Sequence, residues 1–215
     1  MTGVLIPPSA FAAFAPRALP GTRDALEAAA VAFNLKGLPL AHWLGQMHVE
    51  SGGFSKMEES LNYTVDALIS KFGRHRISLI EARAWGRIDK VVGGKKTVAR
   101  KADQEKIANR LYGGDFGRKN LGNIHPTDGW EKRGSGFKQI TGRANEAESG
   151  YTMKELREDV RKSAMAAANF FVKHGCVAPA LRDDVEAVTL KVNGGSMGLA
   201  ERKAATTAAK RVVGV

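Results

Sequence analysis

The chain has 215 residues, of which 43% are hydrophobic and 26% are charged. This length and composition suit one globular domain, or one domain with two lobes, and exclude a disordered chain. The formal net charge of +11 favours polyanionic partners such as nucleic acid, anionic lipid or an anionic cell wall. No apolar run is long enough for a membrane span, and the single cysteine, Cys176, excludes an internal disulfide.

Helical patterns dominate the N-terminal half of the chain. Apolar residues recur at three- and four-residue intervals, and capping residues precede several of these runs. The helices predicted for this half are a short one with Ser9 as its N-cap, then 23–34, 39–50, 64–73, 76–85 and 101–112. Between the last two, the pair Gly93–Gly94 is interpreted as a short turn at a hairpin tip.

A glycine-rich middle separates these helices from a helical C-terminal half. Residues 113–136 contain seven glycines and are predicted to form a loop without packed elements. Thr152 and Glu155 form a capping-box pattern that predicts a helical stretch up to Gly175, with one break. The remaining predicted helices run from Asp183 or Asp184 to about Val192, and over 199–212.

Two glutamates stand on either side of a predicted turn. Glu50 ends an apolar helix pattern, and Glu59 follows it after Ser51-Gly52-Gly53. On a straight helix the two would lie about 13 Å apart, which is too far to act on one bond. The glycines disfavour a continuous helix and favour a fold-back that brings the carboxylates closer. Since cleavage of a glycosidic bond uses two carboxyl groups, the pair is a candidate acid and base; the alternative is two ordinary surface glutamates.

Two polar segments offer further candidate site residues. Gln139, Thr141 and Asn145 place neutral donors and acceptors at short spacing, which suits sugar hydroxyls or the positioning of a water, although a polar turn has the same pattern. Asn193 precedes two glycines and is predicted to end a helix with an accessible amide. The five histidines lack the spacing of a zinc site, so neither a metal nor another cofactor is expected.

Five segments, taken together, carry a resemblance to a known family. They are HVESGGF, ESLNY, IANRLYGG, DGWEKRGSGFKQITGRAN and VNGGSMGLAER. Their order is that of glycoside hydrolase family 19. Over about residues 10–205 the chain resembles the phage endolysin branch of this family, which is also called lysozyme-like or chitinase-like.

This resemblance implies roles for the candidate residues. Glu50 aligns with the family's general acid, and Glu59 is the best match to the general base that activates water in an inverting reaction. Such a pair lies roughly 6.5–9.5 Å apart. The resemblance places an arginine near the second carboxylate, which Arg202 matches. The implied substrate-binding residues are Tyr63, Gln139, Thr141, Asn145, Asn193 and Arg202.

The fold implied by the resemblance is mainly α-helical and lysozyme-like. A single catalytic domain spans residues 1–215. Its large lobe covers about 1–72 and 128–215, and a smaller helical lobe is inserted over about 73–127. A substrate groove is expected between the lobes.

Four positions depart from the family pattern. Val49 intervenes between the histidine and the glutamate, and Ser135 replaces an arginine. Lys132 and Glu146 stand where the family commonly has aromatic residues. These departures concern the contacts to the sugar and leave the carboxylate pair in place.

The predicted function is that of an endolysin, a peptidoglycan hydrolase that cuts a β-1,4 bond of the glycan strand and lyses a bacterial host. The expected partner is peptidoglycan. The basic stretch 202–211, whose apolar face is mostly alanine, is expected to be weakly attracted to anionic membranes; the alternative is a solvated packing helix. Nucleic acid is not expected, because basic and aromatic residues are not interleaved, and a monomer is assumed. Two alternatives remain open: a chitinase acting on N-acetylglucosamine polymers, and a non-catalytic wall-binding protein.

The N-terminal segment also bears on localisation. It begins without a basic region, and Pro7, Pro8 and Pro16 interrupt its apolar residues, which is not typical of a secretion signal. We therefore expect synthesis in the cytoplasm of the bacterial host. The protein would then reach the wall through a separate membrane-permeabilising protein.

Overall fold

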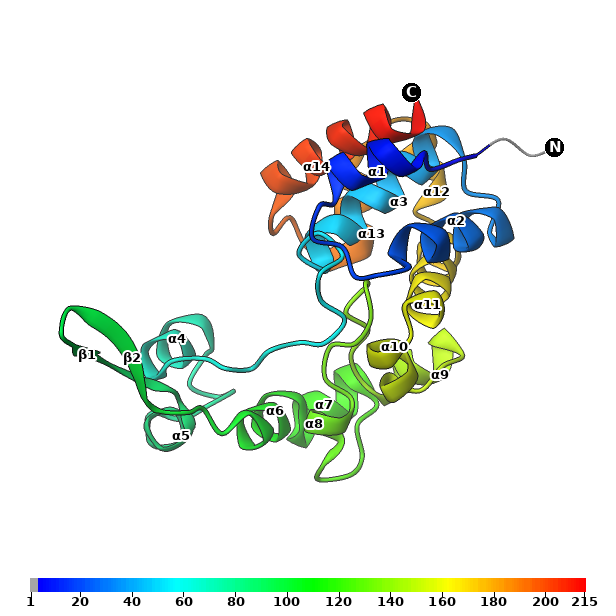
Figure 1. The fold of residues 1–215 in the computed structure, drawn as a ribbon. Coiled ribbons are helices and arrows are strands. Elements are labelled where there is room, and N and C mark those ends of the chain that lie inside the picture. Colours follow the sequence, from blue (N-terminus) through cyan, green and yellow to red (C-terminus); the bar gives the residue numbers. More distant parts are fainter. Residues whose placement is uncertain (1–3) are drawn as a thin grey trace. The chain divides into compact units, whose positions relative to one another are not determined.

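The computed structural model describes residues 4–215, which form two compact units. The first unit consists of residues up to Met57 together with 135–140 and 149–215, and the second consists of 58–134 and 141–148. The second unit thus begins at Glu58, whereas the sequence placed the start of the smaller lobe near residue 73. The described residues are mainly helical, as predicted (Figure 1).

The helices of the first unit come from both ends of the chain. They are α1 (Pro8–Phe14), α2 (Thr22–Ala32), α3 (Gly37–Glu50), α10 (Met153–Glu158), α11 (Val160–Lys173), α12 (Val177–Leu181), α13 (Val185–Asn193) and α14 (Leu199–Val213). Helix α3 is packed against α11, α12, α13 and α14, and α2 lies along α11 (Figure 1). The unit is therefore built around α3, the helix that ends at Glu50.

The second unit combines short helices with one hairpin. Its elements are α4 (Val65–Lys71), α5 (Leu79–Trp85), β1 (Ile88–Val92), β2 (Lys95–Arg100), α6 (Gln104–Tyr112), α7 (Gly114–Leu121), α8 (Asp128–Glu131) and most of α9 (Arg143–Ser149). The strands β1 and β2 pair in antiparallel fashion and turn at Gly93–Gly94, as predicted. The core of this unit is a cluster of apolar residues that includes Leu61, Leu68, Ile107 and Leu111.

The core of the first unit depends on one close helix approach. Residues Pro39–Met47 of α3 are all buried, and Trp43, Leu44 and Met47 are fully buried, as their apolar pattern predicted. A Cβ built at Gly45 would lie 2.7 Å from the backbone of Thr206 on α14. Glycine at this position thus allows the two backbones to approach closely, which brings the N-terminal half of α14 alongside the end of α3.

Several predicted helix starts are confirmed by their caps. The Thr64 hydroxyl accepts a hydrogen bond from the backbone N–H of Ala67 at the start of α4. Thr152 and Glu155 form the predicted capping box, and Asp184, the second of the two predicted candidates, caps α13. In each case a side-chain oxygen accepts a hydrogen bond from a backbone N–H that has no partner within the helix.

Two local predictions are wrong. The first helix begins at Pro8 and follows Pro7, so Ser9 is inside it and is not its N-cap; proline at the first helical position needs no N–H partner. Residues 113–136 are not a plain loop, because they contain α7 and α8. The glycines permit these helices: a Cβ at Gly117 would lie 2.1 Å from the carbonyl oxygen of Tyr112, and Gly122 ends α7 with a left-handed conformation.

Candidate active site

Glu50 is the last residue of α3, at the point where the chain leaves the core of the first unit. The Ser51 hydroxyl donates to the carbonyl of Met47 and accepts from the backbone N–H of Phe54. Gly52, Gly53 and Phe54 all have positive φ angles. This run of left-handed residues cannot continue the helix, so the predicted turn after Glu50 is confirmed and the glutamate is held at a sharp end.

Arg202 of α14 is the partner of Glu50. Its Nη2 lies 2.6 Å from Oε1 of Glu50, and its Nη1 donates to Oε1 of Gln46 at 2.7 Å. Its Nε donates to the carbonyl of Met197. The side chains of Arg202 and Glu50 are only 6% and 12% exposed. The guanidinium thus donates hydrogen bonds to three different acceptors, which fixes its orientation. Because Glu50 is one of these acceptors, the orientation of its carboxylate is fixed as well.

A second cation, Lys138, lies in the same neighbourhood of the first unit. Its ammonium group sits 4.5 Å from the centre of the Phe170 ring. Burial lowers the pKa of Lys138, while the charge of Glu50 acts in the opposite direction. The carboxylate of Glu50 is therefore influenced by two cations, Arg202 and Lys138, and only its Oε1 has a hydrogen-bond partner among residues 4–215. This leaves Oε2 free for a ligand.

Two further candidates belong to the first unit. Gln139 has a left-handed backbone (φ 56°) inside the turn that pairs Ser135 with Ile140, and its side-chain amide donates to the carbonyl of Gly136. A non-glycine residue in this conformation costs conformational energy, which is common at functional sites. Asn193 is the exposed last residue of α13, followed by Gly194 in a left-handed C-cap, as predicted.

Glu59, in the second unit, is held by neutral donors. Its Oε1 accepts a hydrogen bond from the hydroxyl of Tyr112 at 2.6 Å, and its Oε2 accepts one from the backbone N–H of Gly134 at 3.0 Å. The backbone N–H of Glu59 in turn donates to the carbonyl of Gly134. The adjacent Glu58 pairs instead with Arg133, whose guanidinium is stacked on Trp130. Of these two acids, only Glu59 thus lacks a charged partner among residues 4–215.

The charge of Glu59 affects the pKa values of two tyrosines, Tyr63 and Tyr112. Burial, followed by the charge of Glu59, raises the pKa of Tyr63. The same two causes, with the hydrogen bond to Glu59, raise the pKa of Tyr112 far above its usual value. Both phenols consequently keep their protons at neutral pH, and Tyr112 remains a hydrogen-bond donor to the carboxylate.

Thr141 and Asn145 lie together at the start of α9. The side-chain amide of Asn145 donates to the carbonyl of Thr141 at 2.7 Å. The segment is fixed by Arg143, whose guanidinium pairs with the fully buried Asp128 and whose backbone N–H donates to the buried Asn123. These two predicted substrate-binding residues therefore belong to the same unit as Glu59.

Sequence reasoning missed three residues of these surroundings. Tyr112 lies in one of the segments that carry the family resemblance, so its position there was a usable signal. Lys138 lies in another of these segments and had the same kind of signal. Gln46 had none, because an isolated glutamine predicts no contact. The partner of Arg202 was also not predicted: the sequence suggested the second carboxylate, and the structure pairs this arginine with Glu50.

Comparison with known proteins decides the family. A protein of Haemophilus influenzae (strain ATCC 51907 / DSM 11121 / KW20 / Rd), described as a glycosyl hydrolase family 19 domain-containing protein, is 32% identical over 168 residues, which cover 75% of this chain and 74% of that protein. The chain belongs to glycosyl hydrolase family 19. No family model matches it. Its mainly helical structure is consistent with the lysozyme-like fold of this family.

As a member of family 19, the protein is a glycoside hydrolase that acts on glycans. Glycoside hydrolysis needs one carboxyl group that gives a proton to the leaving oxygen and a second that acts on water or on the sugar. Glu50 and Glu59 are candidates with fixed orientations and different partners. Among residues 4–215 no group of three or more His, Cys, Asp and Glu side chains could hold a metal ion.

The single cysteine, Cys176, lies in the core of the first unit. The thiol is fully buried, and burial raises its pKa to about 11. It is therefore a small core residue and not a reactive nucleophile at neutral pH.

None of the helices within residues 4–215 has the length and apolar character needed to cross a bilayer.

Proposed function

We propose that this glycoside hydrolase is an endolysin that cleaves a β-1,4 bond in the glycan strand of bacterial peptidoglycan. The observation that carries the proposal is the contrast between its two fixed carboxylates in a family 19 chain. Glu50 is held through one oxygen by Arg202 and keeps Oε2 free, whereas both oxygens of Glu59 accept hydrogen bonds from neutral donors.

In the proposed mechanism Glu50 is the general acid. The proton is carried on Oε2 and passes to the glycosidic oxygen as the C–O bond breaks, while Arg202 keeps Oε1 in place. An acid that is held within hydrogen-bond reach of its target contributes roughly 10²–10⁴-fold to the rate. The cation beside Oε1 then stabilises the carboxylate that forms when the proton has left.

Glu59 is the proposed general base. It takes a proton from a water molecule that attacks the anomeric carbon, so that one bond to oxygen forms as the other breaks and the configuration inverts. Thr141 and Asn145, which share its unit, are the proposed ligands of this water or of the sugar. Tyr63, Gln139 and Asn193 are proposed to bind the sugars of the strand.

The charge of the protein supports peptidoglycan as the substrate. With a net charge of +11, the protein is attracted to an anionic wall, and this attraction weakens as salt screens it. Chitin is uncharged, so its hydrolysis would gain nothing from this charge. Production in the cytoplasm of a bacterial host, passage to the wall through a separate membrane-permeabilising protein, and weak attraction to anionic membranes complete the proposal.

The deciding experiment compares substrates and products. Wild-type protein and the Glu50→Gln variant are added to outer-membrane-stripped cells, purified peptidoglycan and chitin oligomers, and fragments are identified by mass spectrometry. We expect the wild type alone to lyse cells and to release glycan fragments with new reducing ends. Proton NMR of the first product should show the α-anomer, as inversion requires.

Other outcomes would overturn specific parts of the proposal. Hydrolysis of chitin oligomers without hydrolysis of peptidoglycan would make the protein a chitinase. Equal lysis by wild type and Glu50→Gln would remove Glu50 from the mechanism. A first product in the β-configuration would exclude the inverting route and the role given to Glu59.

A further inference from the structure

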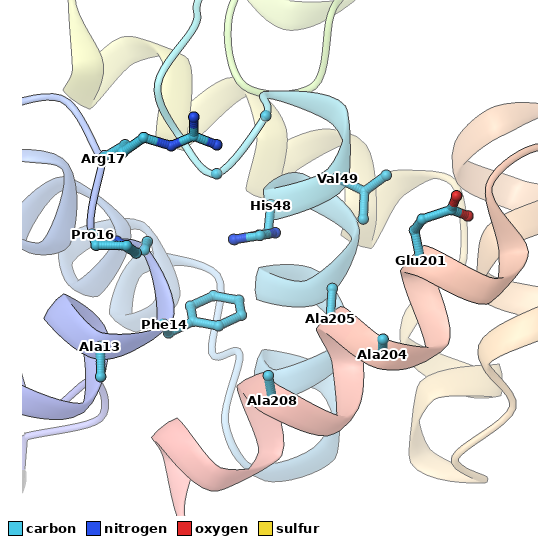
Figure 2. A pocket seen from close by; sticks show the side chains of 13 residues that line it. Ala13, Phe14, Pro16, Arg17, His48, Val49, Glu201, Ala204, Ala205 and Ala208 are labelled. Atoms are coloured by element: carbon cyan, nitrogen blue, oxygen red, sulfur yellow. The ribbon is translucent and has the colours of Figure 1, made fainter.

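The first unit contains a pocket that the reaction does not use. It has a volume of about 650 Å³, within the range of small-molecule sites. It lies between the end of α1, the end of α3 and α14 (Figure 2). We call it the alanine pocket, and its lining residues are Ala13–Arg17, His48, Val49, Gly52, Gly53, Glu201, Ala204, Ala205 and Ala208.

The walls of the alanine pocket are apolar and uncharged. Alanine methyl groups of α1 and α14 line it, and the rings of Phe14 and His48 face each other with centroids 4.6 Å apart (Figure 2). Burial lowers the pKa of His48, so the imidazole is neutral at neutral pH. Such walls suit small apolar groups and offer little to a sugar ring, whose hydroxyls need hydrogen-bond partners.

The rim of the pocket carries one charge of each sign. Figure 2 shows Arg17 and Glu201 at opposite sides of the pocket. Both are exposed, and neither forms an ion pair within the described part of the chain. The next residue after Glu201 differs from both: Arg202 is buried and pairs with Glu50. The rim therefore has a free cation and a free anion on either side of an apolar hollow.

We propose that the alanine pocket binds a short peptide of small residues that carries both a carboxylate and an ammonium group. Its methyl groups would pack on the alanines, its carboxylate would pair with Arg17, and its ammonium group with Glu201. This inference rests on the proposed function, because peptidoglycan carries such a peptide: the stem, with alanines, carboxylates and a diamino acid. Chitin has no stem, so the pocket would be a determinant of substrate choice.

The position of the pocket supports this assignment. Val49 lines it, and the next residue is Glu50; on α14, Glu201 lines it and the next residue pairs with Glu50. The pocket and the proposed acid thus share two helices of one unit. A stem peptide attached to a glycan strand would be bound by the same rigid element that holds the acid, which aligns substrate and catalyst at low entropic cost.

The first test is binding of a synthetic stem tetrapeptide, L-Ala–γ-D-Glu–meso-diaminopimelate–D-Ala, followed by NMR on the full chain. We expect saturable shifts confined to the ends of α1 and α3 and to α14. Arg17→Glu and Glu201→Lys should each weaken binding about fivefold, as an exposed ion pair is lost and replaced by repulsion. Ala204→Phe, which fills the pocket, should abolish binding.

Matched variants serve as controls. Arg211→Glu changes an exposed arginine of α14 outside the pocket, and Ala200→Phe adds the same ring to an exposed alanine outside it. Both should bind like the wild type. The proposal is overturned if the tetrapeptide does not bind, if Arg17→Glu and Arg211→Glu act alike, or if octyl glucoside competes equally well and is insensitive to Arg17→Glu.

A second test separates this inference from the proposed function. Hydrolysis is measured on intact peptidoglycan and on glycan strands whose peptides were removed with an amidase. We expect the wild type to prefer intact strands, and Arg17→Glu and Ala204→Phe to lose this preference but to keep the wild-type rate on peptide-free strands. If the wild type cuts both equally, the pocket proposal is wrong and the hydrolase stands. If it cuts neither, the proposed function is wrong, and the binding titration alone decides the pocket.

Discussion

The two units hold their glutamates in opposite ways. In the first unit Glu50 is nearly buried and paired with a cation, Arg202, which is itself buried and held by Gln46. In the second unit Glu59 accepts hydrogen bonds only from uncharged groups, the hydroxyl of Tyr112 and a backbone N–H. This difference shows that two identical side chains can have different chemical roles when their hydrogen-bonding and charged partners differ. It also means that the role of each glutamate can be tested by substituting a different partner residue.

The largest effect is expected for Glu50→Gln. If Glu50 is the acid, its loss should lower kcat on natural glycan by roughly 10³-fold. The loss should nearly vanish with an aryl glycoside, because a phenolate leaves without a proton. Rates on both substrates, measured side by side, check this; an equal loss on both would contradict the acid role.

Glu59→Gln should lower kcat by roughly 10²-fold on both substrates, because water activation is needed whatever the leaving group. The same pair of rates is the measurement. Recovery with the aryl glycoside would show that Glu59, and not Glu50, protonates the leaving group. The comparison between the units would then be reversed. Glu58→Gln is the matched control, since the adjacent acid pairs with Arg133.

Arg202→Met should affect stability as well as rate. Removing one partner of a buried ion pair leaves Glu50 without its hydrogen-bonded cation and costs about 3 kcal/mol. For a chain of this size the cost corresponds to a fall in Tm of roughly 6–12 °C. Calorimetry checks it, with Arg211→Met on the same helix as the exposed control. A change in Tm no larger than that of the control would show that the pair is not structural.

Tyr112→Phe removes one neutral donor from Glu59 and changes little else. The loss of one hydrogen bond should reduce kcat about fivefold with a small change in stability. Steady-state rates and a thermal melt test this. A 10²-fold loss would mean that Tyr112 itself takes part in proton transfer, and no loss would mean that Gly134 alone orients the base.

The units should also differ slightly in their response to acid. Burial lowers the pKa of His42, which is fully buried beside Asp183 and Lys210 in the first unit. As the pH falls, His42 is therefore protonated in the unfolded chain before it is protonated in the folded chain. The free energy of unfolding is thus highest above about pH 6.5 and decreases as the pH drops below that value. In the second unit burial raises the pKa of Asp128, but the hydrogen bonds from Arg143 and from the backbone N–H groups of His125 and Ile124, together with the charge of Arg143, lower it by more. The stability that Asp128 contributes is therefore lost only below about pH 3.8.

Urea titrations between pH 7 and 5 measure this difference. The wild type should lose stability over this interval, and His42→Gln should lose less, because only the contribution of His48, whose pKa burial also lowers, then remains. Asp128→Asn should be destabilised at pH 7 but keep the wild-type slope. Equal slopes for the wild type and His42→Gln would show that His42 does not control the response.

Local sequence was sufficient for much of the fold. Helical periodicity and caps such as Thr64 and Thr152 act over a few residues, so they can be recognised without tertiary structure. The same holds for the turn after Glu50, because consecutive glycines disfavour a helix. Prediction failed in residues 113–136, where composition suggested a loop. There glycines are required by close backbone contacts, and these depend on which elements pack together.

What the sequence by itself determined, then, is the helical class, the main turns, the order of the family segments and the two glutamates. Only the tertiary structure decided their partners. Arg202 reaches Glu50 across 152 residues, and Tyr112 reaches Glu59 across 53. Such contacts come from helix packing, as where Gly45 admits the backbone of α14, and no local pattern encodes them. The alanine pocket arises in the same way, from the ends of α1 and α3 and from α14, which is distant from them in the chain.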